Sequence, residues 1–406
     1  MKNKLFFSAL LAACVTCVAQ AVEISDLTVS KTETKTIEGD LATNRLTIAG
    51  GNSTDAKGGT LIVNGNTTIV SNLTSGNGSQ LQMGSTLETE SVEFISETAN
   101  EIRRGFTIFG TIKTNNFKVS AAEGSSAQVH LTSGGGCIQS SGTEKGTFEV
   151  GKNAELLIGN PTKSAAGSIK NMNTVINGGT LNVKYYATMD GITLNSGAIN
   201  IINTYDPIWG SKPIEGTIDL GDITVENGTL TLEEAAITSD ITMNSGTLQF
   251  LGDCQTGDLI LNGGTIYFGE SAVTLSEAGL ASLNDVTTVT TGALTLNSGT
   301  IYVADNYVID LGGEALTLSE NVNIVMSVES LDNVEGLTVF AKAGNVEGMD
   351  KLSVTLVDAT GTEKEMAVSY KTDGSVVTST IPEPTTATLS LLALAALAAR
   401  RRRASR

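Results

Sequence analysis

A ten-residue unit that recurs through the middle of the chain constrains the fold more than any other feature. Each copy has two arms of alternating apolar and polar residues that meet at a glycine, as in ITMNSGTLQF at 241–250. The glycines of six copies are Gly179, Gly197, Gly228, Gly246, Gly264 and Gly299. Three steps between successive glycines are 18 residues long, the step of 35 is close to twice 18, and the step of 31 contains an insertion around 205–209.

This alternation predicts β-strands, because successive side chains of a strand point to opposite faces. One unit cannot bury its apolar face alone, whereas stacked copies bury a continuous core. We therefore expect an all-β fold, a parallel β-helix or β-solenoid with rungs of about 18 residues. We favour the right-handed form because the strict hexapeptide pattern of left-handed β-helices is absent. The alternative is a meander of antiparallel hairpins, since Asn-Gly and Ser-Gly also form two-residue hairpin turns.

Stacked copies would also align polar side chains into ladders. Rungs about 4.8 Å apart place the threonines before the corner in one outward column and the asparagines at the corner in another. These residues are Thr193, Thr224, Thr242 and Thr295, and Asn195, Asn244, Asn262 and Asn297.

The strength of the repeat divides the body into three parts. They are an irregular β-repeat region at 22–170, regular β-solenoid repeats at 171–304 and a β-rich capping region at 305–380. The first part contains weaker copies such as Gly59-Thr60-Leu61 and Gly146-Thr147-Phe148. The third contains a hairpin turn at 372–375, and we interpret this part as a cap on the last rung. A short helix is expected at 276–284.

The end of the chain has three parts in a fixed order, Pro382-Glu383-Pro384, an apolar run at 387–399 and an arginine cluster. The prolines keep the segment before the run extended. The run has 13 residues, and a full span needs roughly 20, so we expect a short apolar helix that sits shallowly in a bilayer. Arg400, Arg401, Arg402 and Arg403 would orient the C-terminus toward the cytoplasm.

These three parts resemble the PEP-CTERM sorting signal of Gram-negative bacteria, and the resemblance covers 381–406. It implies that an exosortase-type transpeptidase recognises Pro382, Glu383 and Pro384 while the inner membrane holds the chain transiently. The arginines would be the stop and orientation element. A permanent C-terminal anchor is the alternative to processing.

The first 21 residues are typical of a secretory signal peptide with an apolar signal helix. Ala19 and Ala21 frame a small-x-small cleavage site, so Val22 is the expected mature N-terminus. Cys14 follows Leu-Ala-Ala as in a bacterial lipobox, and lipid attachment at Cys14 is the alternative.

The charge of the body excludes several classes of partner. The chain carries 25 basic and 43 acidic residues, and the segments 1–21 and 385–406, which the two signals would remove, hold seven of the basic residues and none of the acidic ones. The remaining body therefore has a net charge of −25 (18 minus 43). Nucleic acid and anionic lipid both need a basic face, so the body is not expected to bind either.

The sequence offers few residues for catalysis or metal binding. His130 is the one histidine of the chain. A Ser-His-Asp triad would have to use it, and a His/Cys zinc site would lack ligands, so neither is expected. Cys137 and Cys254 lie several rungs apart in a stack, beyond the reach of a disulfide, and are expected to be buried and unbridged. We expect no catalytic residue, no metal and no cofactor.

The enzymatic alternative is a β-helical polysaccharide lyase or glycosidase, which needs paired carboxylates or an acidic cluster with a base. Asp219 with Asp222 is one pair, and Asp206 lies near Trp209 in the insertion. Arg103-Arg104 is the one basic pair of the body, and a solvated loop explains it equally well. Neither acidic group forms the run of acids typical of β-helical galacturonases.

Outward aromatic side chains favour a binding role over a catalytic one. Tyr267 and Tyr302 occupy the same outward position of their repeats, and Trp209 lies in the insertion. Aromatic rings present an apolar face with a polar edge, so contact with extracellular polysaccharide is a hypothesis. An ice-binding threonine array is a further alternative.

The repeats at roughly 170–305 resemble those of autotransporter passengers, without the outer-membrane barrel of a true autotransporter. Taken with the terminal signals, they predict an exported, non-enzymatic protein of the bacterial envelope. Its expected place is the cell surface or an exopolysaccharide matrix, and its body is expected to be structural or adhesive.

Overall fold

A computed structural model of the chain describes residues 21–51, 57–72, 78–98, 105–131, 136–159, 167–184, 187–202, 218–233, 238–269, 287–304 and 306–381. These residues form β-strands joined by turns and loops, with no α-helix and one short 3₁₀ turn at Met349–Lys351. The expected signal helix, C-terminal apolar helix and short helix at 276–284 lie outside the described residues.

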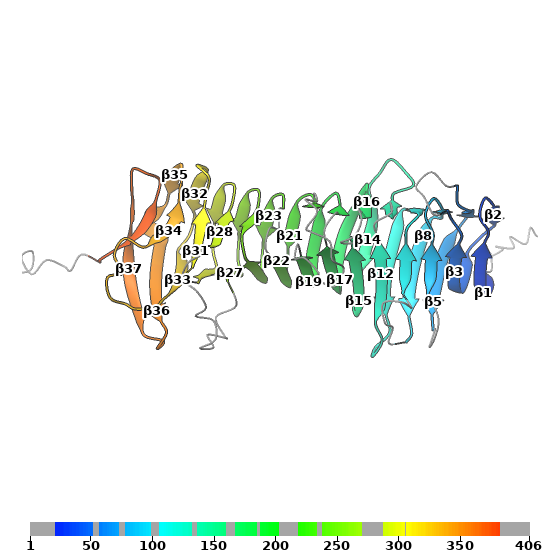
Figure 1. Ribbon diagram of the computed structural model, residues 1–406, viewed down its shortest axis with the longest axis horizontal. Helices are drawn as coiled ribbons and strands as arrows, with labels where there is room; N and C mark the ends of the chain where they lie inside the picture. Colours follow the sequence, from blue (N-terminus) through cyan, green and yellow to red (C-terminus); the bar gives the residue numbers. More distant parts are fainter. Residues whose placement is uncertain are drawn as a thin grey trace, which may run out of the picture.

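The strands stack into three columns along one long axis, with the first strands at one end and the last at the other (Figure 1). Four long strands turn a corner and belong to both the first and the second column: β1 (Val22–Val29), β3 (Leu41–Ile48), β17 (Met172–Lys184) and β19 (Ile192–Ile202). The first column also contains β5 (Asn66–Ser71), β8 (Ser91–Ser96), β11 (Asn116–Ala121), β14 (Gly146–Val150), β21 (Ile223–Val225), β23 (Ile241–Met243), β26 (Leu259–Leu261), β29 (Leu294–Leu296), β32 (Ala315–Leu318) and β35 (Asn345–Glu347).

The other two columns complete each turn of the chain. The second contains β6 (Ser79–Leu81), β9 (Phe106–Ile108), β12 (Ala127–Leu131), β15 (Ala154–Ile158), β22 (Thr229–Glu233), β24 (Thr247–Leu251), β27 (Thr265–Phe268), β30 (Thr300–Val303), β33 (Val322–Val328) and β36 (Leu352–Asp358). The third contains β2 (Thr34–Ile37), β4 (Thr60–Val63), β7 (Thr86–Glu88), β10 (Thr111–Lys113), β13 (Cys137–Gln139), β16 (Gly167–Lys170), β18 (Ala187–Thr188), β20 (Ile218–Asp219), β25 (Cys254–Gln255), β28 (Thr287–Thr290), β31 (Tyr307–Asp310) and β34 (Thr338–Ala341).

Neighbouring strands in these columns pair in parallel, as a β-solenoid-like fold requires. In the first column, Ile223 pairs with Ile241 and Ile241 with Leu259. In the second, Leu230 pairs with Leu248 and Leu248 with Ile266. The alternative of an antiparallel meander is therefore wrong for the repeats, since the two arms of a unit lie in different columns and do not pair with each other.

The length of one turn varies along the stack. It is 18 residues between Asn244 and Asn262, as the glycine spacing predicts. The step of 35 residues is one turn and not two, because Leu259 pairs directly with Leu294 and Asn262 contacts Asn297. The first turn of the 22–170 region has 19 residues, from Val22 to Leu41, and later turns there are longer, with 25 residues between Asn66 and Ser91; all continue the same three columns.

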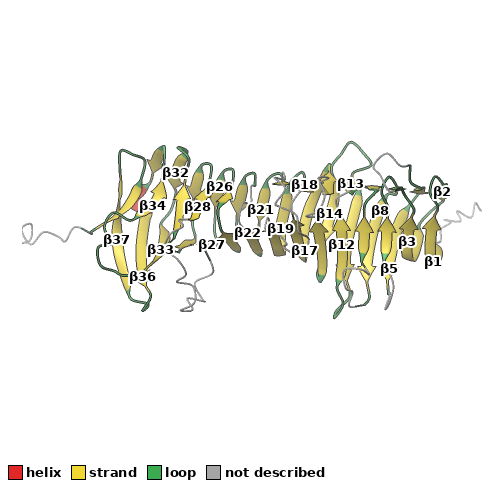
Figure 2. Ribbon diagram, in the orientation of Figure 1, coloured by secondary structure: helices red, strands yellow, loops and turns green. Residues whose placement is uncertain are grey.

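The inward side chains of all three columns form one continuous core. Alternate residues of each strand are buried, as in the second arm of the repeat, where Leu230, Leu248 and Ile266 are fully buried. Each such side chain contributes about 1.5–3 kcal/mol of hydrophobic stabilisation relative to an exposed one. Phenylalanines fill the wider parts, and Phe250 and Phe268 stack with ring centroids 4.8 Å apart. Figure 2 shows these strands along the whole stack, joined by turns and loops.

Glycines at the corner between the first and second columns allow close stacking of successive turns. Gly246 has a φ of 88° and Gly264 a φ of 93°, in the left-handed region that other residues rarely adopt. A Cβ atom on Gly246 would lie 2.4 Å from the carbonyl oxygen of Gly228 in the turn below. The corner therefore needs glycine for both its backbone conformation and its close approach.

The C-terminal end of the stack is closed by two antiparallel strands. β37 (Glu363–Tyr370) pairs antiparallel with β36, and β38 (Val376–Ser379) pairs antiparallel with both β37 and β34. The predicted turn at 372–375 joins β37 to β38, where Gly374 has a φ of 85°. β37 and β38 thus cover strands that would otherwise be edges, whereas β31 to β36 of the region 305–380 continue the parallel columns.

The corner glycines give a test of this packing. Gly246→Ala should lower the free energy of unfolding by about 2–5 kcal/mol, because it combines left-handed backbone strain with a clash against the turn below. Gly336→Ala is the matched control, since Gly336 has a φ of 85° but nothing within 4 Å of its Cβ position. The control should lose only about 1–2 kcal/mol. Urea unfolding of both variants measures the difference, and equal losses would contradict the close stacking.

Candidate functional site

The outward positions of the second column form a row of side chains along the stack. Pairing places Tyr267 directly against Tyr302, with Gln249 before them and Val325 after them. Farther along the same row lie Asn182, Asn200 and Thr231. The predicted aromatic positions are therefore brought together, whereas Trp209 lies outside the described residues.

The two tyrosine rings stack on each other. Their centroids are 5.0 Å apart and their planes are inclined by 11°. One face of each ring is thus covered by the other ring, and the opposite faces look toward the rows of Gln249 and Val325. A sugar that contacts this pair would meet mainly the ring edges and hydroxyl groups. The pair also stabilises the stack, by about 0.5–1.5 kcal/mol beyond the area that it buries.

Asparagines at the corner form the predicted ladder. The Nδ2 atom of Asn262 donates to Oδ1 of Asn244 at 2.8 Å, and Nδ2 of Asn297 donates to Oδ1 of Asn262 at 2.7 Å. The sequence analysis missed two members. Asn177 accepts from Asn195 at 2.8 Å, and the Glu226 carboxylate accepts from Asn244 at 3.0 Å. Their positions immediately before each corner were the signal that could have found them.

Threonines form two outward rows rather than one. Thr193, Thr224 and Thr242 are in register as expected, but Ile260 separates Thr242 from Thr295. A second, uninterrupted row follows the corner glycine and contains Thr229, Thr247, Thr265 and Thr300. The sequence analysis overlooked this second row, although a threonine follows the glycine in each of these four repeats.

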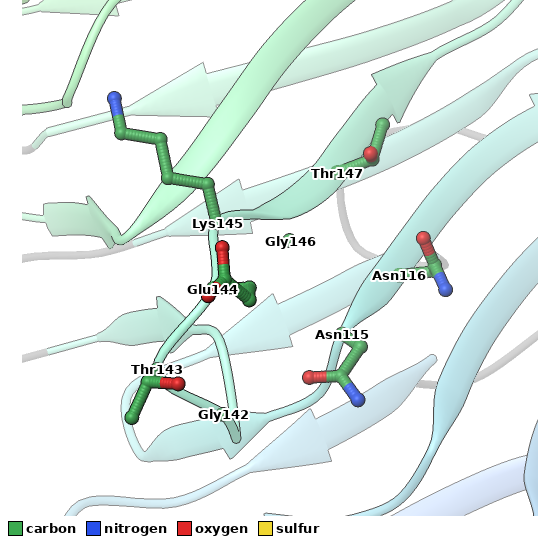
Figure 3. Close-up of a pocket in the computed structure, with 8 residues that line it drawn as sticks. All are labelled: Asn115, Asn116, Gly142, Thr143, Glu144, Lys145, Gly146 and Thr147. Carbon is green, nitrogen blue, oxygen red and sulfur yellow. The ribbon is translucent and has the colours of Figure 1, made fainter.

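A depression of about 440 Å³ lies beside the first column near its corner with the third (Figure 3). Asn115, Gly142, Thr143, Glu144 and Lys145 are among its lining residues. The Asn115 Oδ1 atom accepts the Ser141 hydroxyl at 2.7 Å, and the Lys145 side chain extends away from Asn115. The Asn115, Thr143, Glu144 and Lys145 side chains are exposed, and Nζ of Lys145 donates to the Asp190 carbonyl outside the loop at 3.3 Å, so the depression is a gap between turns rather than a built pocket.

The candidate catalytic residues do not converge on one site. His130 lies in β12 in the outward row that leads to Tyr267, with its Nε2 atom 3.4 Å from the Gly159 carbonyl oxygen. Asp219 and Asp222 are both exposed, and the Asp219 carboxylate accepts the Gly221 N–H at 3.3 Å. Asp206 and Arg103-Arg104 lie outside the described residues. Among the described residues, no Lys, Arg or His forms an ion pair with the Asp219 carboxylate.

Cys137 and Cys254 are both buried, in β13 and β25, and no disulfide joins them. The thiol of Cys254 lies 3.2 Å from the carbonyl oxygen of Glu233, and that of Cys137 lies 3.7 Å from the side-chain oxygen of Gln139. This agrees with the prediction that the two residues are buried and unbridged.

Hydrogen bonds hold several carboxyl groups in the ionised form. The Ser30 N–H lowers the pKa of Glu33, the Thr360 hydroxyl lowers that of Asp358, and the Ser375 N–H lowers that of Asp373. Burial alone would raise the pKa of Asp310, but bonds from Lys342 and the Gly312 N–H outweigh it, and the pKa is lowered. A glycosidase acid needs a raised pKa, so none of these four groups is suited to that role.

Within the described ranges, no cluster of three or more His, Cys, Asp or Glu side chains is arranged to hold a metal ion. Over the same ranges, no helix has the length and hydropathy that a bilayer span requires. The proposed sorting residues Pro382, Glu383, Pro384 and Arg400 to Arg403 lie outside the described residues, as does Ala19, whereas Ala21 is described and exposed. Comparison of the chain with protein-family models, curated proteins and solved structures found no match.

The asparagine ladder gives a second test. Asn262→Ala removes two side-chain hydrogen bonds, to Asn244 and from Asn297, whereas Asn195→Ala removes only the bond to Asn177. At about 0.5–1.5 kcal/mol for each bond, Asn262→Ala should lower the free energy of unfolding about twice as much as Asn195→Ala. Thermal and urea unfolding of the two variants measure this ratio. An equal loss in the two variants, or a larger loss in Asn195→Ala, would contradict a stabilising contribution from each bond of the ladder.

Proposed function

We propose that this chain is an exported protein of the bacterial cell envelope whose C-terminal signal directs its sorting. The observation that carries the proposal is the order Pro382-Glu383-Pro384, apolar run and arginine cluster at 381–406. A signal peptide cleaved after Ala21 would take the chain through the inner membrane, and the apolar run would hold it there transiently. An exosortase-type enzyme is the proposed partner, and Arg400 to Arg403 orient the tail.

The proposed role of the body is structural or adhesive, at the cell surface or in an exopolysaccharide matrix. We assign it as a right-handed β-solenoid whose regular rungs have about 18 residues. An elongated stack with polar ladders on its outer faces suits a spacer, since its side chains are engaged with neighbouring turns. The net charge of −25 for the body (18 minus 43) supports solubility outside the cell.

Glycan contact at Tyr267 and Tyr302 is a second candidate, favoured by their half-buried, outward and adjacent positions. In that case Tyr302→Ala should reduce retention of the protein on immobilised exopolysaccharide about two- to tenfold, the loss of one aromatic contact. Tyr370→Ala is the control, because Tyr370 is an exposed tyrosine of the cap, 45% accessible and distant in sequence from the pair. Equal retention of both variants would reject glycan contact at this pair.

The sorting signal is tested in the native host by intact-mass spectrometry with cell fractionation. The mature protein should begin at Val22 and end near Pro384. Glu383→Ala, or loss of Arg400 to Arg403, should leave a precursor that retains Arg406 and stays with the inner membrane. Glu363→Ala makes the same chemical change at an exposed position of β37 and should be processed normally. Normal processing of the Glu383→Ala and arginine-deleted chains would reject the sorting role.

A further inference from the structure

The two ends of the stack differ in how their last strands are covered. At the C-terminal end, β37 lies antiparallel on β36. At the N-terminal end, β1 pairs with β3 on one side, and no described strand pairs with its other side. Figure 1 shows β1 and β37 at opposite ends of the molecule. An uncovered parallel edge offers backbone donors and acceptors to another strand.

Backbone bonds at its two ends show which groups of β1 face outward. The Val22 N–H donates to the Asp40 carbonyl, and the Val29 carbonyl accepts from the Ala49 N–H. The backbone N–H and C=O groups of Val22 and Val29 therefore point toward β3. Because direction alternates along a strand, Glu23 and Thr28 direct their N–H and C=O groups to the uncovered edge. Both side chains are exposed.

The side-chain pattern of β1 reads the same in both directions from its centre. In the first arm, Val22 and Ile24 are in register with the inward residues of β3, and in the second arm Leu27 and Val29 are inward and buried. The inward residues therefore have even numbers before the corner near Ser25 and odd numbers after it. Suppose that a second β1 strand lies antiparallel to the first, with the first arm of each copy against the second arm of the other. Inward residues then lie opposite inward residues, Val22 opposite Val29 and Ile24 opposite Leu27.

We propose that this N-terminal edge is an interface for a second copy of the same chain, with two β1 strands paired antiparallel about a two-fold axis between Ser25 and Asp26. In this register Glu23 lies opposite Thr28 of the second copy, and both residues direct backbone groups to the uncovered edge. The pairing forms about four to six backbone hydrogen bonds between the chains. The product is a head-to-head dimer with closed two-fold symmetry.

Charge and exposure fit this register. No like charges lie directly opposite, because Glu23 faces Thr28 and Asp26 faces Ser25 of the second copy. The Asp26 carboxylate is also paired with Arg45 of its own chain at 2.8 Å. Val22 is 38% exposed, one of three exposed large apolar side chains in the described residues, and it lies opposite Val29 of the second copy. Pairing would cover it.

Head-to-tail stacking is disfavoured by the other end. A head-to-tail fibre would need a parallel strand surface there, and β37 instead covers β36 in the antiparallel sense. The exposed residues Glu363, Lys364 and Glu365 of β37 are charged, a common protection of edges against further pairing. The geometry thus favours a closed dimer.

The test uses charge changes at Thr28, whose side chain is exposed and outward. Thr28→Glu places like charges opposite each other at two symmetric positions and should weaken dimerisation about 2- to 30-fold. Thr28→Lys places opposite charges there and should strengthen it. Thr28→Val is the neutral control and should associate about as strongly as the unchanged protein. Sedimentation equilibrium of the full chain measures association, and small-angle X-ray scattering measures its maximum dimension.

The expected result is a dimer about twice as long as the monomer. Association should be strongest in Thr28→Lys, intermediate in Thr28→Val and weakest in Thr28→Glu. A monomer at all concentrations, a side-by-side dimer of monomer length, or the same association in all three variants would each overturn the proposal. The inference does not rest on the sorting signal. The intact mass of the same samples reports terminal processing separately, so failure of one proposal is distinguishable from failure of the other.

Discussion

Parallel backbone pairing between successive turns is the interaction on which the rest of this molecule depends. It fixes a repeat of about 4.8 Å along the axis. At that spacing Leu230, Leu248 and Ile266 stack into a core, and Asn244, Asn262 and Asn297 stack into a ladder. Most of each turn's contacts are to the turns before and after it, so the continuous core is built up turn by turn and stability accumulates from nearest-neighbour terms.

Local pattern was sufficient to predict the strands, the corners and the parallel stacking of the regular repeats. It was insufficient to predict the path of the chain between them. Gly59-Thr60-Leu61 and Gly146-Thr147-Phe148 look alike, yet Thr60 lies in the third column and Thr147 in the first. The 35-residue step looked like two turns because its length is close to twice 18, whereas the pairing of Leu259 with Leu294 makes it one. Pairing partners are set by stacking, which a single unit does not encode.

The outward rows of side chains also depend on stacking that the local sequence pattern does not encode. Tyr267 and Tyr302 were placed together from their positions in the repeat, but mutual stacking of their rings depends on side-chain direction, which spacing does not determine. Glu226 takes an asparagine's place in the ladder because a carboxylate oxygen accepts the same amide hydrogen bond. The sorting residues remain a reading of sequence, since Pro382 to Arg406 lie outside the described residues.

The direction of the hydrogen bonds has a mechanical consequence. The ends of the described stack lie at opposite ends of the long axis (Figure 1), and the bonds between turns run along that axis. Tension between the ends would therefore open the bonds of one turn at a time, rather than shear many together. Each released turn of 18 residues would yield about 60 Å of extended chain. Such a rod lengthens in steps under load and limits the force passed to whatever holds it.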